Sequence, residues 1–464
     1  MSGSSPTSFG YVILIASVAA IGGFLFGFDS GVINGTVSAL SEAFGSSSVG
    51  TGFSVASMLL GSAVGALLAG PLADRYGRKL LLLATAVGFA VSALGSGVAA
   101  TSTEFVLYRL LGGVAVGGAS VLAPAYISEV APAAVRGRLA SLQQLAIVLG
   151  IVVAFLSNYV IAESSGGAKQ PWWLGYQAWR WMFWVGVLPA LALLLGTLFI
   201  PESPRFLVGA GRPNDAEKVF ARIGGGDARE QVRSVQESLL ADHRPSMRDL
   251  VDAKTGRLFP LVWVGMGLSV LQQFVGINVV FYYGEVLWRS AGFSEAEALL
   301  VNLSSGGVNL LATFVAMALI DRAGRKPLLL FGSIGMALTL GSLAACFAQG
   351  TLNPDGELVL SASIGRAALI LANLYVFSFG VSWGPVVWVL LGEMFPNRYR
   401  AAALSVGASV QWVANFLVTM TFPVFLAGLG LAVSYGIYAG FAALSVLFVI
   451  RVVHETKGRT LEQM

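Results

Sequence analysis

The chain has 464 residues, of which 56% are hydrophobic and only 11% charged, with a formal net charge of +4 and a mean hydropathy of +0.77. A soluble globular protein carries about 25% charged residues, so this composition excludes a water-exposed surface over most of the chain. One cysteine, Cys346, excludes an intramolecular disulfide framework and a cysteine-based metal site, and His243 and His454 are too far apart to predict a metal site.

Long apolar runs dominate the sequence. A run of 18 or more apolar residues with few charges predicts a transmembrane helix. In chain order, such runs cover residues 11–34, 52–72, 80–99, 104–127, 138–161, 180–200, 258–288, 298–320, 327–348, 364–392, 401–427 and 430–452. The prediction is an all-α membrane protein of twelve transmembrane helices. An even number of spans puts both termini on the same side of the membrane.

One long polar segment divides the spans into six and six. The predicted organisation is an N-terminal six-helix bundle over residues 1–200, a cytoplasmic helical linker over 201–257, a C-terminal bundle over 258–453 and a cytoplasmic tail over 454–464. Within the linker, Asn214 is expected to cap a short helix over 215–223 that ends at Gly224. A linker of this length is too short for a separate regulatory or enzymatic domain.

Basic residues gather in alternate connections between the spans. These connections and the tail hold 23 of the 28 lysines and arginines, at 74–79, 128–138, 201–257, 321–326, 393–400 and from Arg451 onward. By the positive-inside rule, both termini and the linker are cytoplasmic, in a protein of the cytoplasmic (inner) membrane. The net positive charge therefore follows from membrane topology and does not indicate a nucleic-acid partner.

Short charged motifs recur six spans apart. Asp-Arg-Tyr-Gly-Arg-Lys at 74–79 follows the second span, and Asp-Arg-Ala-Gly-Arg-Lys at 321–326 follows the eighth. Glu-Val-Ala-Pro at 129–132 corresponds to Glu-Met-Phe-Pro at 393–396, and each has an arginine seven residues after the glutamate. Motifs that repeat in register at the same side of the membrane predict a duplicated six-helix bundle.

A third pair completes the pattern, with Pro-Glu-Ser-Pro-Arg at 201–205 and His-Glu-Thr-Lys-Gly at 454–458. We expect the charged turns to pair with acidic and basic residues at neighbouring helix ends and to act as a cytoplasmic gate, because such pairs bias one conformation. The alternative is positive-inside loops with incidental acids. The expected network comprises Asp74, Arg75, Arg78, Glu129, Arg136, Glu202, Arg205, Asp321, Arg322, Arg325, Glu393, Arg400 and Glu455.

These motifs resemble those of the major facilitator superfamily and, within it, the sugar porter family. Gly-Pro-Leu-Ala-Asp-Arg-Tyr-Gly-Arg-Lys at 70–79 is similar to the superfamily signature, and the motifs at 201–205 and 455–458 are similar to sugar porter signatures, although His454 stands where the family usually has proline. The resemblance covers essentially the whole chain. It implies two six-helix bundles around a central cavity that opens alternately to each side, without a cofactor.

Two opposite charges lie inside predicted spans. Asp29 and Arg109 both lie roughly 5–10 Å below the outer surface, at about 1.5 Å per helical residue, which suggests a pair. A charge inside a span is costly and indicates function by default. The pair either pins two helices together or couples transport to a proton. Proton-coupled sugar porters carry the matching Asp and Arg, whereas facilitative animal glucose transporters have Asn at the first position, so the resemblance favours coupling.

Neutral hydrogen-bonding side chains lie at mid-membrane in the seventh span, at Gln272, Gln273 and Asn278. Amides offer donors and acceptors together, which suits the vicinal hydroxyls of a sugar. The alternative is that some amides only join helices. In the sugar porter family, the residues that line the sugar site match Gln144, Gln272, Gln273, Asn278, Tyr282, Asn309, Trp388, Gln411 and Trp412 of this chain. The match is looser at Asn309.

The predicted function is proton-coupled uptake of a hexose such as glucose by alternating access. Gly384-Pro385 is expected to break the tenth span, either as a moving gate or as a static kink. A related xylose–proton symporter has Gln and Leu where this chain has Ile151 and Phe281, which favours a hexose over a pentose. The alternatives are a facilitative sugar uniporter and a membrane sugar sensor. No catalytic constellation is present, so an enzyme is not expected. The expected partners are a sugar, a proton and the lipid bilayer, and the protein is expected to work as a monomer.

Overall fold

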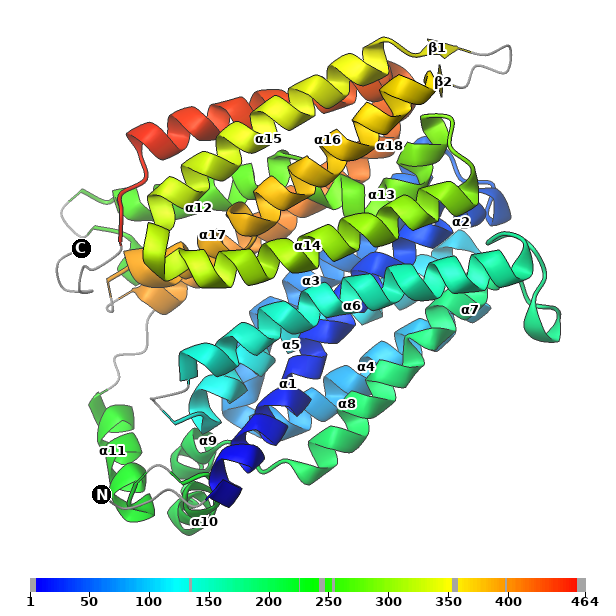
Figure 1. The fold of residues 1–464 in the computed structure, drawn as a ribbon. Helices are drawn as coiled ribbons and strands as arrows, with labels where there is room; N and C mark the ends of the chain where they lie inside the picture. Colours follow the sequence, from blue (N-terminus) through cyan, green and yellow to red (C-terminus); the bar gives the residue numbers. More distant parts are fainter. Residues whose placement is uncertain are drawn as a thin grey trace.

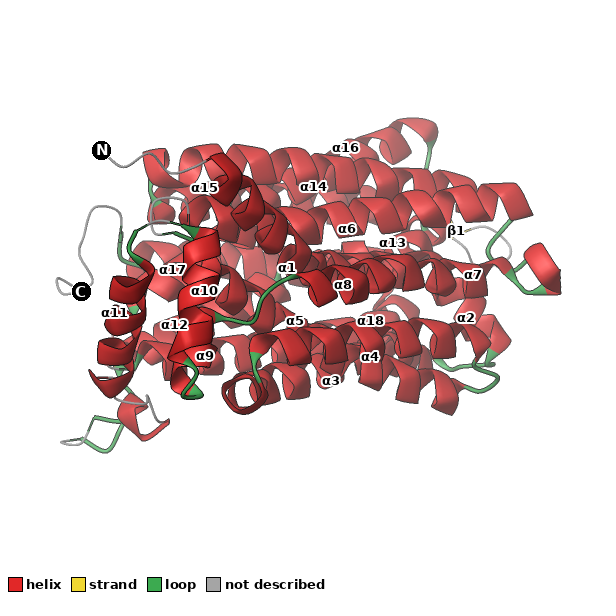
Figure 2. Ribbon diagram, turned by 90° about the horizontal axis from the view of Figure 1, so that it is seen from below, coloured by secondary structure: helices red, strands yellow, loops and turns green. Residues whose placement is uncertain are grey.

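A computed structural model describes residues 6–132, 136–224, 226–241, 247–252, 255–352, 358–396 and 399–456. These residues form a mostly helical molecule in which eleven segments are long and apolar enough to cross a membrane. The long helices lie side by side with their axes roughly aligned, and the view turned by 90° shows the same alignment (Figures 1 and 2). Large apolar side chains such as Leu107, Leu188 and Leu338 are exposed on their outer faces. Exposed apolar surface of this kind indicates contact with lipid.

The helices before the linker are here called the N-terminal half. They are α1 (Pro6–Val32), η1 (Ile33–Thr36), α2 (Val37–Ala43), α3 (Ser48–Tyr76), α4 (Arg78–Val98), α5 (Ser102–Val130), α6 (Arg136–Ser165), η2 (Trp173–Gly175), α7 (Ala178–Val185) and α8 (Val187–Phe199). The linker region forms the short helices α9 (Pro204–Gly209), α10 (Pro213–Ile223), α11 (Ala228–Ala241) and η3 (Met247–Leu250). The expected cap at Asn214 is wrong: Pro213 occupies the first turn of α10, so the capping position falls on Arg212.

The helices after the linker are here called the C-terminal half. They are α12 (Pro260–Phe274), α13 (Ile277–Ser290), α14 (Glu295–Ala323), α15 (Arg325–Ala348), α16 (Ala362–Val381), α17 (Trp383–Met394) and α18 (Arg400–Arg451). Two short strands, β1 (Thr351–Leu352) and β2 (Leu358–Val359), pair antiparallel. Each of the first ten predicted spans coincides with an observed helical segment, and α18 covers the last two.

The molecule has two ends that differ in what they carry. The beginning of α1, the end of α18 and α9, α10 and α11 lie at one end, here called the linker end (Figure 1). Helix α2 and the β1–β2 hairpin lie at the opposite end, here called the hairpin end (Figure 1). Helix α10 runs across the direction of the long helices (Figure 2). The two charged repeat motifs at 74–79 and 321–326 both fall at helix junctions of the linker end.

Both repeat motifs turn at a glycine whose backbone dihedral φ is positive. Gly77 (φ 90°) joins α3 to α4, and Gly324 (φ 96°) joins α14 to α15. Residues with a Cβ rarely adopt this region, so glycine permits a reversal within a single residue. Because each junction is only one residue long, the charged side chains beside it are held next to the end of the following helix.

Two candidate membrane segments are interrupted by a helix break. The seventh is interrupted at Val275 and Gly276 between α12 and α13. The tenth breaks at Ser382 between α16 and α17, two residues before the predicted Gly384-Pro385. The reason is that Pro385 lies in the first turn of α17 and has no backbone N–H to donate to the carbonyl four residues earlier. At the two breaks, the backbone carbonyls of Val275 and Trp383 accept hydrogen bonds from side chains.

Helix α18 contains 52 residues, with a kink at Gly430, where φ is 75° and ψ is 175°. Its candidate membrane segment, Ala402–Arg451, contains 50 residues. A helix crosses the hydrocarbon core with about 20 residues. The length of this segment therefore exceeds what one crossing needs.

Candidate functional site

Asp29 of α1 and Arg109 of α5 form an ion pair inside the N-terminal half. Nη1 of Arg109 donates to Oδ1 of Asp29 at 2.5 Å, and the two side chains are only 2% and 6% exposed. The second guanidinium nitrogen contacts the sulfur of Met58 at 3.1 Å, and the guanidinium lies over the ring of Phe183. A buried ion pair is stable only when its charges are compensated, so each residue depends on the other.

The pair is satisfied on one side only. Within the described residues, Oδ2 of Asp29 and Nε of Arg109 have no hydrogen-bond partner. A carboxylate has two acceptor oxygens, so one oxygen of Asp29 is left without a donor among the described residues. Arg109 also lines a small cavity together with Ser30 and Tyr282. Tyr282 belongs to α13 of the C-terminal half, so this cavity connects the charge pair to the other half of the molecule.

Three predicted sugar-site amides form a chain at the break of the seventh span. Nδ2 of Asn278 donates to Oε1 of Gln273, and Nε2 of Gln273 donates to Oε1 of Gln272 at 3.4 Å. Nε2 of Gln272 in turn donates to the carbonyl of Trp383 at 2.7 Å, at the break of the tenth span. The two broken spans are thus joined by amide side chains. The hydroxyl of Tyr375 donates to the freed carbonyl of Val275 at 2.8 Å.

The other predicted sugar-site residues occupy four further helices. Gln144 on α6, and Gln411 and Trp412 on α18, are half-buried, whereas Trp388 on α17 is 43% exposed and Asn309 on α14 is buried. In the described part of the chain, no hydrogen bond links them to the amide chain. Oε1 of Gln411 is buried without a partner there, and the ring of Trp412 meets that of Phe26 in the other half at 5.6 Å.

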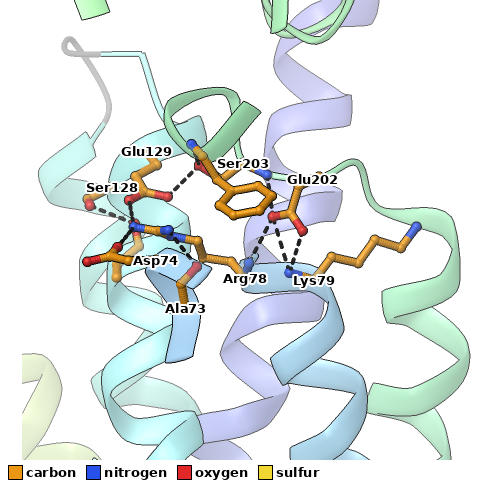
Figure 3. A network of polar contacts seen from close by, with 10 residues as sticks. Ala73, Asp74, Arg78, Lys79, Ser128, Glu129, Glu202 and Ser203 are labelled. Atoms are coloured by element: carbon orange, nitrogen blue, oxygen red, sulfur yellow. Dashed lines mark hydrogen bonds and ion pairs between the residues drawn. The ribbon is translucent and has the colours of Figure 1, made fainter. Parts of the chain in front are cut away.

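The charged motifs of the N-terminal half meet at the linker end (Figure 3). Nη2 of Arg78 lies 3.0 Å from both Asp74 and Glu129, and Glu129 accepts a hydrogen bond from Ser203. Glu202 accepts from the backbone N–H groups of Arg78 and Ser203 at 2.9 and 2.7 Å. A carboxylate at the start of α4 satisfies backbone donors that the helix itself leaves unpaired.

The C-terminal half repeats this network at the matching residues, with one added bond from Nε of Arg325 to Glu393. Nη2 of Arg325 lies 3.1 Å from Asp321 and 2.7 Å from Glu393, and Glu393 accepts from the hydroxyl of Thr456 at 2.6 Å. Glu455 accepts from the backbone N–H of Arg325 at 3.0 Å. The sequence repeat is therefore a structural repeat. Each network joins helices of one half, so the ion pairs described here need not break when the two halves separate.

Five further predicted network residues lie in the first or last turn of a helix. Arg75 lies over the ring of Tyr76 at 5.2 Å, and Arg400 donates to the carbonyl of Phe395. Arg205 lies in α9 and Arg322 in the last turn of α14. Arg136 begins α6, but its side chain lies outside the described residues, as do the last residues of the repeat motif at 454–458.

Polar side chains at the hairpin end bridge the two halves, and sequence reasoning did not single them out. Nδ2 of Asn34 in η1 donates to the carbonyl of Phe281 at 2.9 Å, and its Oδ1 accepts from Asn302 at 2.7 Å and from the backbone of Glu285 at 3.0 Å. Glu285 also accepts from Ser38. Glu285 falls within a predicted span, so the rule that selected Asp29 would have found it.

The sequence is similar to those of known transporters. The family model for sugar (and other) transporters matches residues 15–464. A glucose transport protein of the cyanobacterium Synechocystis is 54% identical over 455 residues, covering 98% of this chain and 97% of its own. No described group of His, Cys, Asp or Glu is arranged to hold a metal ion.

Solved structures of the xylose transporter XylE from Escherichia coli have the same fold. The partially occluded inward-open form superposes with a TM-score of 0.83 at 36% identity and covers 97% of this chain and 100% of XylE. A second structure, of the proton:xylose symporter XylE bound to 6-bromo-6-deoxy-D-glucose, superposes with a TM-score of 0.77 at 37% identity and covers 98% of both chains. The chain thus matches a transporter over its whole length.

Proposed function

This chain belongs to the sugar transporter family of the major facilitator superfamily, and we propose that it takes up a hexose such as D-glucose together with a proton. The glucose transport protein at 54% identity supports the choice of sugar. The XylE match supports proton coupling, since that protein is a proton:xylose symporter. The single observation that carries the proposal is the buried Asp29–Arg109 pair, which leaves one carboxylate oxygen open.

The proposed topology has twelve spans. The 50-residue segment Ala402–Arg451 is longer than one crossing needs, and its kink at Gly430 lies at the first residue of the predicted span 430–452. The proposed organisation is bundles over 1–200 and 258–453 with a cytoplasmic linker over 201–257 and tail over 454–464. The basic connections and the gathering of α9, α10 and α11 at one end support a cytoplasmic linker end. The protein then lies in the inner membrane and acts as a monomer in the bilayer.

In the proposed coupling step, Asp29 takes a proton on its open oxygen and loosens its hold on Arg109. An opposite charge keeps a carboxylate ionised, so protonation and separation of the pair favour each other. Tyr282 shares the adjoining cavity with Arg109 and belongs to the other half. The hydroxyl of Tyr282 also lies 3.5 Å from Asn415 on α18. This placement offers a short path from the proton site to the proposed sugar site.

The proposed sugar site centres on the amide chain at the two broken spans. Gln272, Gln273 and Asn278 present mixed donors and acceptors beside the break, where backbone carbonyls are also free. Trp388 adds an aromatic face, and Gln411 adds an amide oxygen that has no partner among the described residues. Gln144, Tyr282, Asn309 and Trp412 complete the proposed lining.

The two charge networks at the linker end are proposed to make each half move as one body. Each network ties a one-residue turn to the ends of other helices of the same half, through Arg78 in one and Arg325 in the other. The hydrogen bonds of Asn34 close the hairpin end, as expected of an inward-facing carrier. The likeness to inward-open XylE supports this state.

Uptake of radiolabelled glucose into proteoliposomes tests the proposal. With an inward proton gradient, wild-type protein is expected to accumulate glucose above equilibrium, and a protonophore is expected to abolish the accumulation. Entry that only equilibrates and ignores the gradient would make the protein a facilitative uniporter. Glucose binding without entry would instead favour a sensor. Unlabelled xylose and glucose as competitors then rank the two sugars.

A further inference from the structure

Glu285 of α13 is a buried acid that the proposed proton and sugar sites do not use. Its side chain is only 2% exposed, within a segment apolar enough to span the membrane. One carboxylate oxygen accepts from the hydroxyl of Ser38 at 2.7 Å, and the other lies 3.3 Å from Nη1 of Arg289. A carboxylate removed from water needs such partners, so the loss of either one is costly while Glu285 stays buried.

The bond between Glu285 and Ser38 crosses between the two halves, because Ser38 belongs to α2 in the N-terminal half. The backbone N–H of Glu285 binds the same half through Oδ1 of Asn34 at 3.0 Å. Glu285 therefore binds the N-terminal half through both its side chain and its backbone. Two charged groups face the carboxylate: Arg289 on its own helix and Glu295 on α14. Glu295 in turn accepts from the backbone of Ala168, a further bond between the halves.

The geometry points to Glu285 as a latch of the gate at the hairpin end. It positions α13 against α2, and its bond to Ser38 stabilises the state closed at that end. Opening this end separates Ser38 from Glu285 and admits water, which then solvates the carboxylate. Removal of the Ser38 hydroxyl leaves one carboxylate oxygen of Glu285 unpaired in the closed state only. The change therefore shifts the equilibrium between the closed and open states toward the open state. The inference rests on the alternating access of the proposed function but on neither the sugar nor the proton.

The substitution Ser38→Ala tests the latch through a distance between the halves. Val49 on α3 and Ala296 on α14 are both exposed. Spin labels at these two positions report the distance between the halves at the hairpin end. They are placed in a Cys346→Ala background, and distances are measured by pulsed electron paramagnetic resonance without sugar. Ser38→Ala is expected to raise the ratio of long to short distances about tenfold, from the loss of one hydrogen bond to a buried charge.

Two companion variants separate a latch from general loosening. Ser41→Ala removes a hydroxyl one turn away that donates to Ser46 within the same half, and it is expected to leave the distances unchanged. Glu285→Gln is expected to shift the ratio in the same direction as Ser38→Ala. The double variant is expected to equal Ser38→Ala alone, because both changes act on one contact. Wild-type distances in Ser38→Ala, an equal shift in Ser41→Ala, or full additivity would overturn the latch.

Sugar uptake gives a second readout that a structural role alone would not move. A carrier that is open more often at the hairpin end has a higher apparent affinity for sugar arriving there. Ser38→Ala is therefore expected to lower KM for entry several-fold, and an unchanged KM contradicts the latch. If wild-type protein moves no glucose, the proposed substrate fails while the distance measurement still decides on the latch.

Discussion

Glu202 offers a stability prediction whose size follows from its contacts. Its carboxylate accepts from the backbone N–H groups of Arg78 (2.9 Å), Lys79 (3.2 Å) and Ser203 (2.7 Å). The first two are donors at the start of α4 that have no partner within the helix. Loss of a helix cap costs about 0.5–2 kcal/mol, and loss of the charge at the helix N-terminus about 0.3–1 kcal/mol. Glu202→Ala is therefore expected to cost about 1–3 kcal/mol.

The thermal transition of the purified protein in detergent measures this effect, with an expected fall in Tm of about 1–3 °C for a chain of this length. Glu455→Ala removes the equivalent cap of α15 and is expected to lower Tm by a similar amount. Glu217→Ala breaks only an exposed ion pair with Arg229 and should change Tm by less than about 1 °C. An unchanged Tm in Glu202→Ala, or an equal fall in Glu217→Ala, would refute the capping role.

Two further substitutions probe the break of the seventh span. Gly276→Ala puts a Cβ 2.7 Å from the ring of Tyr438 at a backbone φ of 83°. We therefore expect the free energy of unfolding to fall by about 2–4 kcal/mol, with a lower Tm. Gly440→Ala, whose Cβ meets nothing within 4 Å, is the control and should not lower Tm. Tyr375→Phe leaves the carbonyl of Val275 unpaired, so a loss of about 1–2 kcal/mol is expected in the same assay; an unchanged Tm would mean that another donor replaces the hydroxyl.

The spans were predictable because a helix that crosses a membrane needs about 20 consecutive apolar residues, and such runs can be recognised from composition alone. The repeat motifs were predictable because duplicated charges stand out against an apolar background. Their pairing also followed from opposite charges at neighbouring helix ends, as Arg78 with Glu129 and Arg325 with Glu393 illustrate. The sequence did not indicate that each network stays within one half, since that depends on how the halves pack.

The helix breaks were harder to predict. Gly276 lies in an apolar run in which many glycines stay helical, so its positive φ has no distinct signature. The break of the tenth span was expected at Gly384-Pro385 but falls at Ser382, because a proline disrupts the bond to a carbonyl four residues before it. The bonds of Asn34 and Glu285 across the halves were also missed, since the sequence does not show which residues about 250 positions apart come into contact.

Asp29 is the residue on which the proposed proton coupling depends most, and Asp29→Asn tests this role directly. Two rates are compared in proteoliposomes: glucose accumulation under an inward proton gradient, and exchange of labelled for unlabelled glucose at equal concentrations. Exchange needs no net proton movement, so the variant is expected to exchange glucose but to lose accumulation. Accumulation in Asp29→Asn at the wild-type level would contradict proton coupling through this carboxylate and leave the Asp29–Arg109 pair as a structural link between α1 and α5.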